Sequence, residues 1–141
     1  MTEKKKGNRM KFLIVDDEVT SRNMVLTMLT GIAECDEAAS GPEAIEKFKA
    51  SAEADSPYNL ILMDIVMPEM DGHATAKAIR LFEKEQGIPV DKRAKIIMLT
   101  ALNSPQDAME SIFNAQSAAY IVKPVSKDNL LGTIGKLGLK K

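Results

Sequence analysis

The sequence predicts an α/β protein built on a doubly wound parallel sheet, and three observations point to it. Short, continuous apolar runs recur along the chain, helical patterns separate them, and most runs end at a polar residue. Uninterrupted apolar runs of roughly 4–8 residues are typical of strands buried on both faces. Strands that alternate with helices indicate a parallel sheet covered by helices on both sides.

Four apolar runs and one weaker segment account for the expected strands. The runs are Lys11–Val15, Leu60–Met63, Ile96–Leu99 and Tyr120–Val122, and the weaker strand is expected near Cys35–Ala39. The sequence therefore predicts a five-stranded sheet.

Apolar residues at helical spacing predict five helices between and after these strands. The first helix contains Val25 and is expected to stop at Gly31. The others are expected to begin at Ser40, after Gly72, at Ser104-Pro105 and after Ser126. Ser40 stands three residues before Glu43, which is the spacing of a capping box.

Length and composition indicate a single globular domain. The chain has 141 residues, of which 45% are hydrophobic and 28% charged, and its formal net charge is −1. This balance argues against a strongly basic nucleic-acid binder. The single cysteine excludes an internal disulfide framework, no apolar run is long enough for a membrane span, and the charged residues 1–9 are no secretory signal. We therefore expect a disordered tail at 1–9, a domain over 10–139 and a cytoplasmic location.

Polar side chains stand at the ends of four expected strands. Asp16 and Asp17 follow the first strand along the chain, and Asp64, Thr100 and Lys123 end or follow the three later apolar runs. In an open α/β sheet, ligands bind at the carboxyl ends of the strands. These five side chains are therefore expected to converge on one pocket.

The residue types in this pocket indicate its chemistry. Three neighbouring aspartates would repel one another and raise one another's pKa unless a cation joins them. A few carboxylates plus water suit Mg²⁺, and one carboxylate could then attack phosphorus to form an aspartyl phosphate. Lys123 and Thr100 would supply a positive charge and a hydrogen-bond donor to the phosphoryl oxygens.

Four motifs in order resemble the receiver domain of two-component response regulators, the chemotaxis-regulator-like family. They are Val15–Glu18, Met63–Gly72, Leu99–Ala101 and Tyr120–Pro124, and the likeness extends over about 10–139. The resemblance implies a flavodoxin-like fold with strand order 2-1-3-4-5 flanked by five helices.

The resemblance also implies individual roles at the acidic site. Asp64 would accept a phosphoryl group from a phosphohistidine. Asp17, Asp64 and the backbone carbonyl of Val66 would bind Mg²⁺ directly, and Asp16 would assist through water. Lys123 would pair with the phosphoryl group.

Further roles carried over from the family concern switching and reversal. Thr100 would move toward the phosphoryl group and Tyr120 would follow, which alters the face formed by the fourth helix, fifth strand and fifth helix. The peptide bond before Pro124 is expected to be cis. Val66 and Leu102 flank the approach of hydrolytic water, and their apolar side chains predict slow loss of phosphate.

One position departs from the family pattern. Gln116 stands where receivers usually have glycine, which places the local turn geometry in question.

The expected partners are a sensor histidine kinase or a histidine phosphotransfer protein, with a downstream target protein that the sequence does not identify. No direct binding of nucleic acid or membrane is expected, and the protein should be a monomer or a phosphorylation-promoted dimer. It would be a stand-alone receiver or a receiver cut from a larger regulator or hybrid kinase.

Two other functions can be weighed against this one. A haloacid-dehalogenase-like phosphatase also uses an aspartate nucleophile, but it needs a second aspartate two residues later, where this chain has Val66. Valine cannot transfer a proton. A degenerate receiver that only binds partners is disfavoured because Asp16, Asp17, Asp64, Thr100 and Lys123 are all present. The protein is thus expected to autophosphorylate and autodephosphorylate with Mg²⁺, and not to turn over an external substrate.

Overall fold

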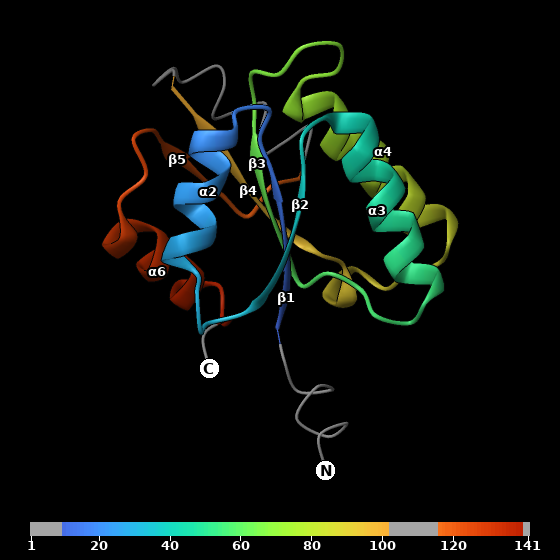
Figure 1. The fold of residues 1–141 in the computed structure, drawn as a ribbon. Helices are drawn as coiled ribbons and strands as arrows, with labels where there is room; N and C mark the ends of the chain where they lie inside the picture. The colour runs from blue at the N-terminus through green and yellow to red at the C-terminus, as the bar shows by residue number, and fades with distance from the viewer. Residues whose placement is uncertain (1–9, 102–115, 140–141) are drawn as a thin grey trace.

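A computed structural model describes residues 10–101 and 116–139 of the chain (Figure 1). The elements in this part are β1 (Lys11–Val15), α2 (Val19–Met28), β2 (Glu34–Ala38), α3 (Gly41–Glu53), β3 (Leu60–Asp64), α4 (Gly72–Glu85), a short 3₁₀ helix (Val90–Lys92), β4 (Lys95–Thr100), β5 (Ala119–Val122) and α6 (Lys127–Lys136). The expected helix after Ser104, the expected tail at 1–9 and Leu102 lie outside the described residues.

The five strands form one parallel sheet in the order β2-β1-β3-β4-β5, which confirms the predicted fold class and strand order. Because all strands run in the same direction, their carboxyl ends lie along one edge of the sheet. The strand order reverses between β1 and β3, so a crevice for a ligand is expected there.

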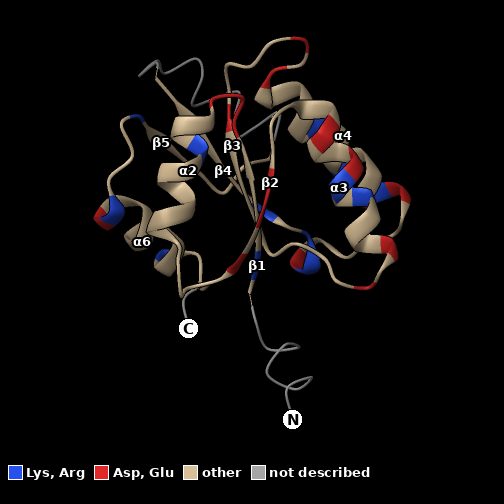
Figure 2. Cartoon of the chain, in the orientation of Figure 1, with Lys and Arg blue, Asp and Glu red and all other residues tan. Residues whose placement is uncertain are grey.

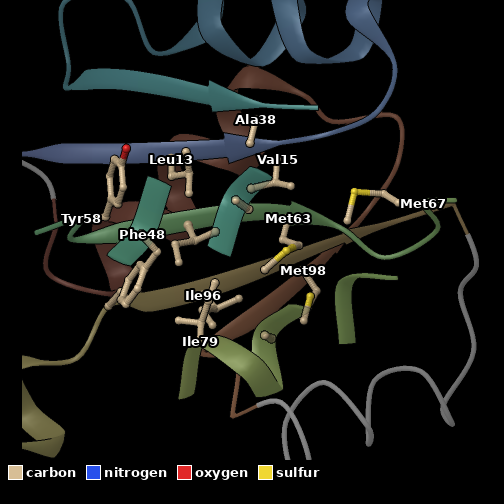
Figure 3. Close-up of a cluster of buried hydrophobic side chains, with 14 of the residues drawn as sticks. Leu13, Val15, Ala38, Phe48, Tyr58, Met63, Met67, Ile79, Ile96 and Met98 are labelled. Atoms are coloured by element: carbon tan, nitrogen blue, oxygen red, sulfur yellow. The ribbon is translucent and has the colours of Figure 1, made fainter. Parts of the chain in front are cut away.

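Helices cover both faces of the sheet. Figure 1 shows α3 and α4 on one side and α2 and α6 on the other. Successive strand residues point to opposite faces, so Leu13 and Val15 of β1 join one buried cluster while Phe12 and Ile14 join the other. Figure 3 shows the cluster on the α3 and α4 side.

Polar side chains cap the starts of α3, α4 and α6, and the cap of α3 lies at Ser40, where the sequence predicts it. The Ser40 Oγ accepts a hydrogen bond from the Glu43 amide at 3.2 Å. The Glu43 carboxylate accepts one from the Ala39 amide at 2.8 Å, one residue before the usual capping-box partner. Asp71 and Ser126 cap α4 and α6 in the same way.

Two chain reversals lie at positions that the sequence singles out, Gly31 and Gln116. The helix α2 ends at Met28, before the expected stop, and Gly31 lies in the following turn with a φ of 83°. Gln116 adopts a φ of 55°, so it takes up the left-handed conformation for which glycine is usually used.

The strand β2 lies at one edge of the sheet and is strongly acidic. Its five residues include Glu34, Asp36 and Glu37, and it pairs with β1. Figure 2 shows these acidic positions along the strand. None of the described helices is both long and apolar enough to cross a membrane.

Candidate functional site

Three aspartates meet at the carboxyl ends of β1 and β3. Asp16, Asp17 and Asp64 each offer a carboxylate oxygen, and these oxygens all lie within 4.8 Å of one another. Asp16 and Asp64 are buried, whereas Asp17 is exposed. The acidic colour of this edge is visible in Figure 2.

Lys123 follows β5 and reaches two of these carboxylates. Its Nζ lies 3.2 Å from Asp16 Oδ2 and 3.5 Å from Asp64 Oδ2. The lysine side chain is mostly buried, so its charge acts on the two aspartates with little solvent screening. One ammonium group therefore bridges residues from two strands.

The electrostatics of the site shift two titratable groups. The pKa of Asp64 is raised to about 6, mainly by burial; Lys123 lowers it, and the charges of Asp16 and Asp17 raise it. Burial lowers the pKa of Lys123, but the attraction of Asp64 and Asp16 outweighs it, so the net pKa is raised. At neutral pH the lysine is thus charged and most of Asp64 is ionised, in a site with more negative than positive charge.

Asp16 is held through each of its polar groups. Its amide donates to the Ala38 carbonyl at 3.1 Å, and its carbonyl accepts from Arg22 Nη1 at 2.7 Å. Its Oδ1 accepts from the Glu18 amide at 2.9 Å, and its Oδ2 faces Lys123. Asp16 therefore connects β1, β2, α2 and the segment after β5.

The loop after β3 brings α4 close to Asp64. The Gly72 amide donates to the Ile65 carbonyl at 2.8 Å, and a Cβ at Gly72 would lie 2.5 Å from the Asp64 carbonyl oxygen. Only glycine fits this approach without a shift of the backbone. Val66 lies in the same loop, and this residue is 61% exposed.

Thr100 and Tyr120 lie on the same face of neighbouring strands. Thr100 pairs with Val122, and Met98 pairs with Tyr120, so the two residues are diagonal neighbours. Thr100 is fully buried at the end of β4, and its carbonyl accepts from the Lys123 amide at 2.7 Å. The peptide bond between Lys123 and Pro124 is cis.

A groove extends from the acidic site along α2. Its volume is about 330 Å³, and it lies between α2 and the segment after β5. Its lining residues are Asp16, Ser21, Met24, Val25, Met28, Lys123, Pro124 and Val125. The groove is therefore polar at the end near the acidic site and apolar along α2.

The structure brings four predicted site residues together, namely Asp16, Asp17, Asp64 and Lys123. Arg22 and the close approach at Gly72 are two further features of the site that were not predicted from the sequence. The Asp-Gly pair at 71–72 was a signal for the latter, whereas no local pattern marks Arg22.

Comparisons with known proteins agree with this geometry. Residues 12–135 match the family model described as "Response regulator receiver domain". The chain is 36% identical over 128 residues to chemotaxis protein CheY of Bacillus subtilis, covering 89% of this chain and 95% of that protein.

Solved structures of similar fold are known with ligands and partners. A CheX–CheY–BeF3–Mg complex from Borrelia burgdorferi matches with a TM-score of 0.80 and 28% identity, over 96% of this chain and 93% of that one. The receiver domain of Ssk1 of Saccharomyces cerevisiae, solved with the histidine phosphotransfer protein Ypd1, matches with a TM-score of 0.79 and 28% identity, over 92% and 89% of the two chains.

The fold and the acidic site define a class of signalling domains that are switched by phosphorylation. The chain belongs to the response regulator receiver domain family of two-component signalling. It is a phosphorylation-controlled switch, a class distinct from enzymes that turn over an external substrate. Its acidic cluster is consistent with Mg²⁺ binding.

Proposed function

We propose that Asp64 is the phosphoacceptor and that Asp16, Asp17, Asp64 and the Val66 carbonyl form the Mg²⁺ site. The observation that carries this proposal is the meeting of three carboxylate oxygens within 4.8 Å beside Lys123. These hard oxygen ligands are the kind that Mg²⁺ prefers. When bound, Mg²⁺ would neutralise charge on the phosphoryl oxygens and on the carboxylates.

The chain's own residues would then carry out phosphoryl transfer. An Asp64 carboxylate oxygen attacks phosphorus while the bond from phosphorus to the imidazole nitrogen of the donor breaks, and the leaving histidine keeps that electron pair. Asp64 must be ionised to attack, and its pKa of about 6 leaves it so at neutral pH. Lys123 lies 3.5 Å from Asp64 and would pair with the transferred phosphoryl group.

The response to phosphorylation would pass through Thr100 and Tyr120. The Thr100 hydroxyl would hydrogen-bond the new phosphoryl group, and Tyr120, its diagonal neighbour on β5, would move toward the space that Thr100 leaves. The helix predicted to begin at Ser104, together with β5 and α6, would form the altered face. A target protein would bind to this face.

The α2 groove is the surface proposed for the phosphodonor, a sensor histidine kinase or a histidine phosphotransfer protein. Val19 and Met24 of α2 are 59% and 51% exposed, and the groove beside Met24 leads to Asp16 and Lys123. A partner that packs on these apolar side chains would bring its histidine close to Asp64. The proposal includes a cytoplasmic location, on the sequence grounds given above.

Reversal of the switch would be slow. Val66 has no group that could orient a water molecule, and Leu102, its expected counterpart, is also apolar. Autophosphorylation from small phosphodonors and slow autodephosphorylation are thus parts of the proposed function, without turnover of an external substrate.

Intact-mass measurement after incubation with a small phosphodonor tests the assignment. The wild type should gain one phosphoryl group only when Mg²⁺ is present, and Asp64→Asn should gain none. Asp55→Asn, which changes an exposed aspartate away from the cluster, is the matched control and should be labelled like the wild type. Equal labelling of Asp64→Asn and wild type would contradict the assignment.

A second experiment tests the switch. Thr100→Ala should still accept the phosphoryl group, but amide exchange between about Ser104 and Leu137 should change less on phosphorylation than in the wild type. Unaltered exchange changes in Thr100→Ala would mean that the response does not pass through this hydroxyl.

A further inference from the structure

We infer that Arg22 is a positioning residue that sets the Mg²⁺ affinity of the acidic cluster by holding the backbone carbonyl of Asp16. This inference rests on the Mg²⁺ site of the proposed function. It concerns a residue outside that site, which would touch neither the metal nor the phosphoryl group.

Arg22 makes two directed contacts from α2. Its Nη1 donates to the Asp16 carbonyl at 2.7 Å, and its Nε donates to Glu37 Oε1 on β2 at 2.6 Å. The arginine side chain is only 13% exposed. The guanidinium is planar and rigid, so the ion pair with Glu37 fixes the direction in which Nη1 points.

The held carbonyl belongs to the peptide unit that joins Asp16 to Asp17. A peptide unit is planar, so fixing its C=O direction also fixes the position of the Asp17 N and Cα. Asp16 has further support from Ala38, Glu18 and Lys123, and it is buried. Asp17 is exposed, so the backbone that leads to it has a larger part in aiming its carboxylate.

Charge alone gives the opposite expectation for Arg22. A cation beside three carboxylates repels Mg²⁺, so its removal would tighten Mg²⁺ binding if only electrostatics mattered. If Arg22 acts by orientation, its removal loosens Mg²⁺ binding. The sign of the change therefore separates the two effects.

Titration calorimetry with Mg²⁺ alone, in the absence of any phosphodonor, measures this sign. Arg22→Gln should raise the Mg²⁺ dissociation constant about tenfold, which is the scale of losses of groups that orient metal ligands. Arg22→Lys should also weaken binding, because an ammonium keeps the charge but not the fork geometry. Lys47→Gln is the matched control: it removes a cation that contacts the Glu37 carbonyl and not Asp16, and should leave the constant unchanged.

Thermal unfolding in the presence of a chelator shows whether each variant folds. Arg22→Lys keeps the positive charge and loses the fork geometry, so it decides the question if Arg22→Gln does not fold. Unchanged or tighter binding in a folded Arg22→Gln, or unchanged binding in Arg22→Lys where only that variant folds, would overturn the inference alone. Failure of the wild type to bind Mg²⁺ would overturn the proposed site and this inference together.

Discussion

The buried carboxylate of the single residue Asp64 lowers the stability of the metal-free protein. Its carboxylate is buried next to two other aspartates, and its pKa is raised to about 6 mainly by that burial. A raised pKa means that the folded state disfavours the charged form. The same feature that makes the site ready for a cation therefore weakens the fold when no cation is bound.

We predict that Asp64→Asn stabilises the metal-free protein at pH 7. The Asp64 carboxyl has an ordinary pKa of 3.8 and a folded-state pKa of about 6. Its contribution to the free energy of unfolding, which comes from the protonated form, is therefore fully present below pH 3.8 and is lost as pH rises through 6. The gain should be at most about 3 kcal/mol, at 1.36 kcal/mol for each pKa unit. Urea unfolding at pH 7 and at pH 4 measures it.

The advantage of the variant should disappear at pH 4, where the wild-type carboxyl is mostly protonated in the folded state. Adding Mg²⁺ at pH 7 should stabilise the wild type and not the variant. A variant less stable than the wild type at pH 7 without Mg²⁺ would contradict the account.

Val66 gives a second prediction at this scale. Val66→Asn together with Leu102→Glu should speed loss of phosphate about tenfold, because polar groups could orient the attacking water and about 1.4 kcal/mol of barrier is a factor of ten. Val66 is 61% exposed, so its change should leave stability nearly unaltered. Phosphate release after removal of the donor measures the rate, and Met24→Gln is a control at another exposed position. Equal rates in the wild type, the double variant and Met24→Gln would show that the side chains at 66 and 102 do not control the attacking water.

The sequence could predict which residues reach the site but not how they are shared between the two faces of the sheet. Asp16, Asp64 and Lys123 each continue the alternation of strand residues that face α2 and α6, such as Ile14 and Leu62. Thr100 instead continues the side on which Met98 lies. A polar residue after an apolar run does not by itself show which face of the sheet its side chain points to. That face depends on the register and on the residue at which each strand stops in the structure.

At the scale of single elements, α6 shows how tertiary contacts override weak helix propensity. It contains Gly132 and Gly135, yet it forms a regular helix from Lys127 to Lys136. Ser126 caps its start, and Leu130 and Ile134 are buried against the sheet. Burial of these two side chains outweighs a cost of roughly 1 kcal/mol for each glycine.

We predict that Gly132→Ala stabilises the protein by about 0.5–1 kcal/mol. A Cβ at Gly132 would meet no atom within 4 Å, so alanine adds helix propensity without a clash. Gly138→Ala is the matched control, because Gly138 has a φ of 77° and alanine there should destabilise. Thermal unfolding of both variants checks the opposite signs; a loss of stability in Gly132→Ala would contradict the account.

Element boundaries were the part of the fold that the sequence predicted least well. The strand β2 begins at Glu34, before the expected Cys35, because its register with β1 pairs Glu34 with Lys11. The helix α2 ends at Met28, before Gly31. In both cases the deciding factor is a backbone partner distant in sequence or a turn, which local composition does not reveal.

At the scale of the whole molecule, one ion pair connects three segments around α4. Arg80 donates to Glu83 Oε1 at 2.7 Å, to the Ala94 carbonyl at 2.8 Å and to the Gln116 carbonyl at 2.9 Å. Glu83 is 1% exposed and also accepts from the Ala94 amide. The pair joins α4 to the start of β4 and to the segment that leads to β5, where Gln116 has its left-handed conformation.

We predict that Arg80→Met destabilises the protein by about 3 kcal/mol, because it leaves the buried Glu83 carboxylate without its cation. Urea unfolding measures the loss. Lys84→Gln removes an exposed cation from the same helix and should change stability by less than about 0.5 kcal/mol. The double variant Arg80→Met with Glu83→Leu should recover part of the loss; equal stability of Arg80→Met and wild type would refute the role of the pair.

The acidic edge strand has a consequence for how copies of this protein meet. An exposed strand edge can pair with the same edge of a second chain and start aggregation, and like charges are one protection against it. Glu34, Asp36 and Glu37 place three carboxylates on five residues of β2, and only Glu37 of these three is paired with Arg22, so two β2 edges still repel when they approach. Self-association through this edge is therefore disfavoured, which keeps the sheet of one copy from being extended edge to edge by the sheet of another.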